Sequence, residues 1–201
     1  MIAIVDYGAG NLFSVKNALD YIGEESLVTG DPVELSRADG ILLPGVGAFP
    51  DAMRMLKESG LIPVLREQAN IKPLLGVCLG MQMLFERGYE FGVTEGLSLL
   101  PGRVVKMTPA NDLPLPHIGW NRLLPKRECP LLAGLPSKPY MYFVHSYRVD
   151  CPPEVLDAAT DYGGEAAAFV SQGMVFGAQF HPEKSSEAGL QILRNFGGLL
   201  R

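Results

Sequence analysis

The chain has little of what marks several large classes of protein. Its 201 residues include only 3 cysteines, too few for a disulfide framework and without the Cys-x-x-Cys spacing of a metal site. The net charge is −5 and no Lys/Arg cluster is present, which argues against binding to nucleic acid or to a membrane surface. No apolar run approaches a membrane span, and the segment Met1–Asp6 lacks the basic start of a signal peptide. We therefore expect a cytoplasmic protein without a bound metal.

Two glycine pairs follow predicted strands, but neither completes a nucleotide-binding motif. After Gly8–Gly10 the third glycine of a dinucleotide fingerprint is replaced by Phe13, and after Gly45–Gly47 it is replaced by Pro50. The chain also has no Gly-Lys-Ser/Thr. We therefore expect no nucleotide cofactor, and indeed no cofactor at all.

Apolar segments with the period of strands alternate with amphipathic helical segments in the first half of the chain. Strands are expected at residues 2–5, 26–29, 40–43 and 74–77, with helices after Asn11, after Asp31, and over about 50–59 and 61–70. Residues 89–137 are rich in Pro and Gly and predict loops and hairpins. Later strands are expected at 140–149, 156–162, 166–171 and 174–180, before a closing helix that buries Leu190, Leu193 and Phe196. The pattern predicts a single α/β domain over 1–201 whose sheet is parallel early and antiparallel late.

The most informative stretch surrounds Cys78. A buried strand over 74–77 leads directly into apolar residues with helical spacing, which predict a helix from Leu79 to about Gly88. Gly76 and Gly80 flank the cysteine and remove the Cβ atoms that a sharp turn would bring into collision. This is the pattern of a nucleophile elbow, and the helix N-terminus favours a thiolate there. A buried cysteine that packs as a small hydrophobe is the simpler alternative.

A nucleophilic cysteine needs a base, and His181 follows a predicted strand that would end at the same sheet edge as Cys78. Glu183 lies two residues further along an extended segment, so it can accept the imidazole proton and orient the ring. Taken alone, a His-x-Glu pair is more often a surface histidine beside a solvated acid. Together with the elbow, the pair predicts a Cys–His–Glu triad.

Attack on a carbonyl would also need donors for the oxyanion. The Leu79 amide is one candidate, and the loop Pro44–Gly47, with the amides of Val46 and Gly47, is placed to supply another. Gln82 lies one helical turn beyond Cys78 and could hydrogen-bond a polar substrate.

Several motifs of the chain together resemble those of a known enzyme family. Gly76–Gln82 and Phe180–Glu183 resemble the class I, triad-type glutamine amidotransferase family, whose fold is a three-layer, flavodoxin-like α/β arrangement. Four further segments extend the resemblance over most of the chain: Ile4–Leu12, Leu43–Phe49, His117–Asn121 and Tyr142–Tyr147. These outer motifs resemble the glutaminases of histidine biosynthesis in particular.

The resemblance implies that Cys78 attacks the side-chain amide of glutamine, with His181 and Glu183 as its partners. It places glutamine against Gln82, the loop Gly45–Gly47, and the segment His145-Ser146-Tyr147, and it leaves His117 with a structural role. Ammonia would pass to a (β/α)₈-barrel synthase subunit that forms imidazole glycerol phosphate and an aminoimidazole carboxamide ribotide. Trp120, the only tryptophan, and Asn11 are expected at the contact with that subunit.

Three alternatives stay open on the residues alone. The chain could be a class I glutaminase that supplies a different synthase. It could be a cysteine hydrolase or peptidase of similar architecture. It could also be a binding module that carries a triad without performing chemistry. No role is assigned to Cys129 or Cys151.

Overall fold

A computed structural model describes residues 1–110 and 112–200, and an eight-stranded sheet lies at its centre. In spatial order the strands are β2 (Ser26–Thr29), β1 (Ile2–Val5), β3 (Gly40–Gly45), β4 (Leu74–Cys78), β14 (Val175–Ala178), β13 (Glu165–Gln172), β12 (Leu156–Asp161) and β9 (Leu124–Pro125). The strands from β2 to β14 pair in parallel, whereas β13, β12 and β9 pair antiparallel. The expected mixed sheet is therefore present, with its parallel part built mostly from the first half of the chain.

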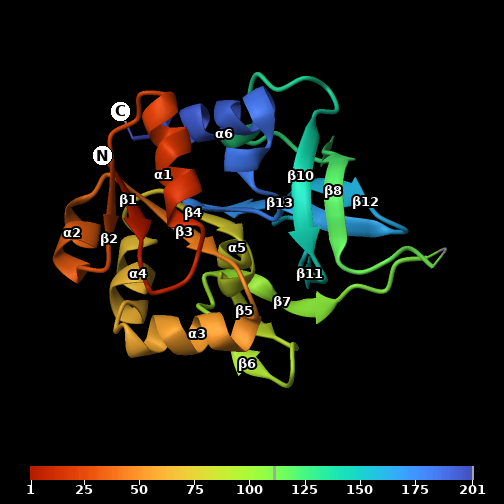
Figure 1. Cartoon of the computed structure of the whole chain (residues 1–201), viewed down its shortest axis with the longest axis horizontal. Helices are drawn as coiled ribbons and strands as arrows, with labels where there is room; N and C mark the ends of the chain where they lie inside the picture. The colour runs from red at the N-terminus through yellow and green to blue at the C-terminus, as the bar shows by residue number, and fades with distance from the viewer. Residues whose placement is uncertain (111, 201) are drawn as a thin grey trace.

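Helices cover both faces of this sheet, which gives three layers (Figure 1). They are α1 (Leu12–Tyr21), α2 (Pro32–Arg37), α3 (Phe49–Glu58), α4 (Ile62–Gln68), α5 (Leu79–Met83) and α6 (Ser186–Gly198), with 3₁₀ turns η1 (Pro130–Leu132) and η2 (Pro182–Lys184). Alternate residues of β1 point into different cores: Ile2 and Ile4 pack with α1 and α6, whereas Ala3 and Val5 pack with α2, α3 and α4. This period of two explains why the strand is apolar throughout. None of the helices in the described part of the chain is long and apolar enough to cross a bilayer.

The expected helix starts are present. The Asn11 side chain accepts a hydrogen bond from the Ser14 amide at the start of α1, and the Asp31 side chain accepts one from Val33 at the start of α2. In α6, Leu193 and Phe196 are buried as expected, but Leu190 is only half-buried.

Two predicted elements are wrong. The helix after Cys78 ends at Met83 and not near Gly88, because Phe85–Gly88 forms strand β5 and pairs with β7. The strand expected over 140–149 is broken at Ser146 into β10 (Tyr140–His145) and β11 (Tyr147–Asp150). The two halves belong to different sheets.

Those two smaller sheets lie beside the main one. One has the order β11, β7 (Leu100–Lys106), β5 and β6 (Thr94–Glu95), and the other pairs β10 with β8 (His117–Arg122). The β8–β10 pair stands near the antiparallel end of the main sheet, beside β12 and β13 (Figure 1). Ser146, at the break, therefore lies where the two small sheets meet.

Candidate active site

Cys78 occupies a strained turn between β4 and α5. Its backbone has φ 56° and ψ −113°, a conformation that residues with a side chain rarely adopt. A Cβ on Gly76 would lie 2.7 Å from the Gly80 carbonyl oxygen, and one on Gly80 would lie 1.9 Å from the carbonyl oxygen of Leu43. Glycine is required on both sides because the chain passes itself at backbone contact. The sharp elbow expected from the sequence is present.

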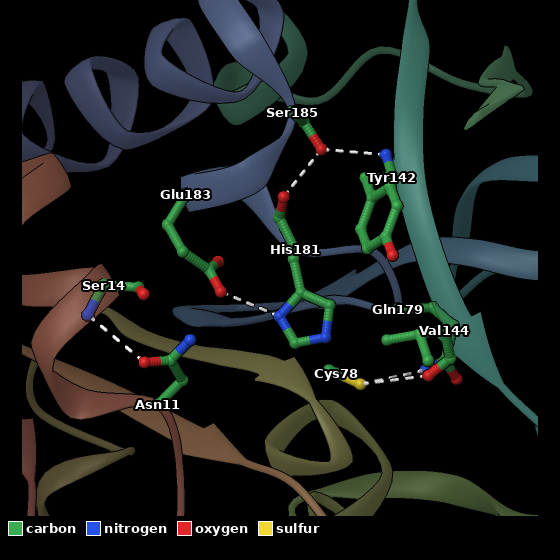
Figure 2. Close-up of polar contacts among 9 residues, drawn as sticks. All are labelled: Asn11, Ser14, Cys78, Tyr142, Val144, Gln179, His181, Glu183 and Ser185. Atoms are coloured by element: carbon green, nitrogen blue, oxygen red, sulfur yellow. Dashed lines mark hydrogen bonds and ion pairs between the residues drawn. The ribbon is translucent and has the colours of Figure 1, made fainter. Parts of the chain in front are cut away.

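His181 and Glu183 lie together next to this elbow. The His181 Nδ1 is 2.8 Å from Glu183 Oε1, and the two side chains are 3% and 2% exposed. Figure 2 shows the second ring nitrogen facing Cys78. Glu183 reaches the ring from the 3₁₀ turn η2 and not from an extended segment, so the sequence argument found the right pair through the wrong backbone geometry.

The backbone around His181 is fixed by its neighbours. The His181 amide donates to the Tyr142 carbonyl of β10 at 3.0 Å, and Ser185 Oγ donates to the His181 carbonyl at 2.6 Å. The same hydroxyl accepts from the Tyr142 amide at 3.0 Å (Figure 2). The imidazole is therefore positioned by β10 and η2 together.

Electrostatics favour a protonated ring. Burial lowers the pKa of His181, but the interactions with Cys78 and with Glu183 outweigh it and raise the pKa to about 10. A positive imidazolium beside the sulfur promotes nucleophilic attack and holds a proton ready for a leaving group. The α5 dipole adds little to this, because the helix has only 5 residues.

The triad opens into a cavity of about 540 Å³. Most of the residues expected to hold substrate or an oxyanion line it: Val46, Gly47, Leu79, Gln82, His145, Ser146 and Tyr147, together with Cys78 and His181. Asn11, expected at a partner contact, also lines it. Sequence reasoning missed four further lining residues, namely Glu90, Pro116, Val144 and Lys184. No motif points to Glu90, which lies in the turn after β5.

The loop that follows β3 is held close to the elbow. Gly45 pairs with Cys78, and a Cβ on Gly45 would lie 2.6 Å from the Gly80 nitrogen, so this glycine packs behind the cavity instead of lining it. The buried Tyr7 hydroxyl donates to the Pro44 carbonyl at 3.0 Å. Gly47 has φ +97°, which glycine adopts without strain. The loop is thus anchored at its start, and glycine allows the turn at its end.

Gln82 is buried and already engaged within the protein. Its Nε2 donates to the Tyr147 carbonyl at 3.1 Å and to Gln179 Oε1 at 2.9 Å. Any contact with a substrate is therefore left to its Oε1. Gln179, whose own Nε2 is 4.0 Å from Cys78 Sγ, was not found from the sequence.

His145 lines the cavity, and His117 lies behind it. His117 Nδ1 is 3.1 Å from His145 Nε2, and His145 Nδ1 is 2.9 Å from the Tyr147 carbonyl oxygen. Trp120 stands apart from the cavity, 53% exposed on β8 near the exposed side chains of Ile118 and Tyr140.

The other two cysteines lack the surroundings of a nucleophile. Burial raises the pKa of both Cys129 and Cys151 to about 11, with help from Asp157 and Asp150 respectively. Cys129 lines a wider groove of about 900 Å³ along residues 125–139, which contains no histidine. Within residues 1–110 and 112–200, no group of three or more His, Cys, Asp or Glu side chains could hold a metal ion.

Comparison with known proteins shows which family the chain belongs to. The family profile "Glutamine amidotransferase class-I" matches residues 3–198. Among solved structures, a glutamine amidotransferase aligns with a TM-score of 0.78 at 20% identity, covering 100% of this chain and 99% of that one. PurLQS from Thermotoga maritima aligns with a TM-score of 0.76 at 19% identity, covering 100% and 98%. At such identities these two structures show the fold alone.

Similarity in sequence goes further. The imidazole glycerol phosphate synthase subunit HisH of Bacillus cereus (strain G9842) is 54% identical over 201 residues, which cover 100% of this chain and 95% of that protein. The HisH subunit of Bacillus mycoides (strain KBAB4) is 49% identical with the same coverage. The chain belongs to the class I glutamine amidotransferases, and within them to the HisH family.

Proposed function

We propose that the chain is the glutaminase subunit of an imidazole glycerol phosphate synthase and that residues 1–201 act as one glutamine amidotransferase domain. The observation that carries the proposal is the His181 ring, which lies between Glu183 Oε1 at 2.8 Å and the sulfur of a strained Cys78, at the wall of a 540 Å³ cavity. The three free thiols fit a reducing compartment such as the cytoplasm.

The reaction follows from the groups present. Cys78 Sγ attacks the side-chain amide carbon of glutamine, and the Nε2 proton of His181 passes to the departing ammonia. The neutral ring then takes a proton from water, which hydrolyses the thioester and releases glutamate and the free thiol. Amides of Leu79 and of Val46 or Gly47 would stabilise the oxyanion in each step.

The cavity also offers a group for the amino-acid end of glutamine. Glu90 Oε2 accepts from the Phe49 amide at 2.8 Å, which fixes this carboxylate at the cavity wall. A buried α-ammonium group would pair well with it. Ser146 and Tyr147 would border the other side of the substrate.

A cysteine exchange tests the chemistry. Cys78→Ser should abolish glutamine-dependent synthesis by the complex with a barrel synthase subunit, while synthesis with added ammonium persists. Cys129→Ser is the matched control and should keep both activities, because its thiol lies outside the cavity. Glutamine turnover by Cys78→Ser at the wild-type rate would refute the assignment. Cleavage of a peptide panel without ammonia release from glutamine would support a peptidase instead.

We further propose that ammonia passes to a (β/α)₈-barrel synthase subunit that makes imidazole glycerol phosphate and an aminoimidazole carboxamide ribotide. The exposed face of Trp120, Ile118 and Tyr140 supports a docking site, because a patch of large apolar side chains on one small sheet is typical of interfaces. Asn11, on the rim of the cavity, would approach the same partner.

Trp120→Ala should weaken binding of the barrel subunit at least about tenfold. Tyr21→Ala, which removes an aromatic side chain exposed on α1, is the control. If the two variants bind the barrel subunit with equal affinity, Trp120 does not lie in the interface.

The chain alone should be a poor glutaminase. The proposed reason is that an amide of the Gly45–Gly47 loop is not aimed at the oxyanion until the partner binds its ligand. Glutaminase activity measured with and without the liganded barrel subunit tests this, and equal rates would contradict it.

A further inference from the structure

A continuous line of hydrogen bonds runs from β8 into the glutamine site. The Asn121 Nδ2 is 3.3 Å from His117 Nε2, His117 Nδ1 is 3.1 Å from His145 Nε2, and His145 Nδ1 is 2.9 Å from the carbonyl oxygen of Tyr147. That carbonyl also accepts from Gln82 at 3.1 Å. The line therefore ends on the backbone of the segment that borders the cavity.

Each end of the line fixes the positions of the ring protons. A carbonyl oxygen only accepts, so His145 Nδ1 must carry the proton and its Nε2 must accept from His117 Nδ1. His117 Nε2 then accepts from Asn121. The Asn121 side chain is oriented to donate to His117, because its Oδ1 accepts from the Arg122 amide and its Nδ2 also donates to the Asp161 carbonyl. Both neutral rings are thus held in the Nδ1–H form.

The surroundings keep both rings neutral and immobile. His117 and His145 are 2% and 6% exposed, and burial together with the neighbouring imidazoles lowers the pKa of each to about 4. The His117 ring is stacked between Phe143 and Tyr162, at centroid distances of 4.9 Å and 4.0 Å. A ring packed in this way cannot turn without disturbing its neighbours.

We propose that Asn121, His117 and His145 form a positioning relay that sets the Ser146–Tyr147 backbone for glutamine binding. Ser146 lies between β10 and β11, its carbonyl accepts from the Met107 amide at 2.9 Å, and Tyr147 pairs with Lys106 of β7. The relay adds a restraint on the Tyr147 carbonyl, beside the one from Gln82, and it ties the site to the strand that carries Trp120. This inference rests on the proposed glutaminase function. His117 acts through His145 and does not touch the substrate.

The first test reads the protons directly and needs no catalysis. The chain has 3 histidines, so ¹⁵N spectra of histidine-labelled protein contain few signals. At pH 7, His117 and His145 should each show a protonated Nδ1 and an unprotonated Nε2. An Nε2–H form of either ring would overturn the relay, because the line of donors and acceptors would then be broken.

The second test separates positioning from packing. His117→Phe keeps the stacked ring but leaves His145 Nε2 without its donor, and the half-saturating glutamine concentration of the complex should rise about tenfold with little change in the saturated rate. His117→Asn can donate from its side-chain nitrogen near the position of Nδ1 and should recover most of the wild-type value. In His117→Phe, His145 Nδ1 should stay protonated, because the Tyr147 carbonyl still accepts from it, and the ¹⁵N signal of Nε2 should shift because this nitrogen has lost its donor.

The outcomes are distinct. If the wild-type complex turns over glutamine and His117→Phe shows an unchanged glutamine dependence, the relay is refuted while the proposed function stands. A loss that His117→Asn does not rescue, or a fall in the saturated rate alone, would indicate general packing damage and also refute the relay. If the wild-type complex does not turn over glutamine, the proposed function fails on its own, whatever the ring protons show.

Discussion

The strained backbone of Cys78 leads to a quantitative expectation. A residue with a side chain at φ 56° and ψ −113° stores on the order of 1–3 kcal/mol of strain, which glycine does not incur. Cys78→Ala and Cys78→Gly both remove the sulfur and its contacts, so their difference isolates the Cβ. Glycine makes the unfolded chain more flexible, which offsets about 0.4–1 kcal/mol of the gain. Cys78→Gly should therefore be more stable than Cys78→Ala by about 1 kcal/mol.

Urea unfolding of the two variants, followed by circular dichroism, measures this difference. In thermal unfolding it corresponds to a midpoint about 2–4 °C higher for Cys78→Gly, given the size of the chain. Neither variant should hydrolyse glutamine. The control is Ala188→Gly inside α6, where the same exchange has the opposite sign and costs about 1 kcal/mol. If Cys78→Ala proves as stable as Cys78→Gly, the turn is not strained and the reasoning fails.

Three further expectations can be measured on the isolated chain. Gly80→Ala places a Cβ 1.9 Å from a backbone oxygen and should lower the free energy of urea unfolding by at least about 3 kcal/mol. The control Gly198→Ala has nothing within 4 Å of the new Cβ and should be neutral or stabilising. Equal costs in the two variants would refute the close backbone contact at Gly80. Because the pKa of His181 is raised to about 10, ¹⁵N spectra of the wild type should show a protonated ring at pH 8. The pKa should be lower in Cys78→Ser, which lacks the sulfur. Titration near 6.5 in both proteins would contradict the pairing of His181 with Cys78. The pKa of His117 is about 4 in the folded chain, below its ordinary value of 6.5, so the unfolded chain takes up the proton first as pH falls. The folded state therefore loses stability as the pH falls from about 6.5 to about 4. Between pH 7 and pH 5 the wild type should therefore lose about 2 kcal/mol more than His117→Phe, and equal losses would argue against a neutral buried ring.

The parallel half of the fold and the Cys–His–Glu cluster could be read from the sequence for one reason. In both, neighbours in the chain decide the geometry: the buried strands are apolar throughout, glycines flank Cys78, and His181 and Glu183 are two residues apart. The carboxyl ends of parallel strands meet at one edge, so placing each residue at a strand end was sufficient to bring the three together.

The predicted elements were wrong where segments far away in the sequence determine the local structure. Phe85 and its neighbours continue a helical pattern of apolar residues, but their backbone pairs with β7, and no local signal announces that strand. Residues 140–145 alternate in burial as a strand does, and Val149 further along is also buried. The break at Ser146 depends on where β7 and β8 stand, which the chain near Ser146 does not encode. Glu90 reaches the cavity from a turn, and Gln179 reaches Gln82 and Cys78 from the end of β14; neither position carries a motif.

The contact among Gly45, Gly76 and Gly80 bears on how this site can change. Two stretches of chain, residues 43–45 and the elbow at 76–81, meet there at backbone contact, so enlarging any one of these glycines pushes on the nucleophile and on the neighbouring loop at once. Saturation libraries at these positions should return almost nothing but the parent residue, singly or in pairs. New substrate preferences would have to arise from the outer wall of the cavity, around Glu90 and Ser146, where side chains can be exchanged without moving the backbone that carries the sulfur.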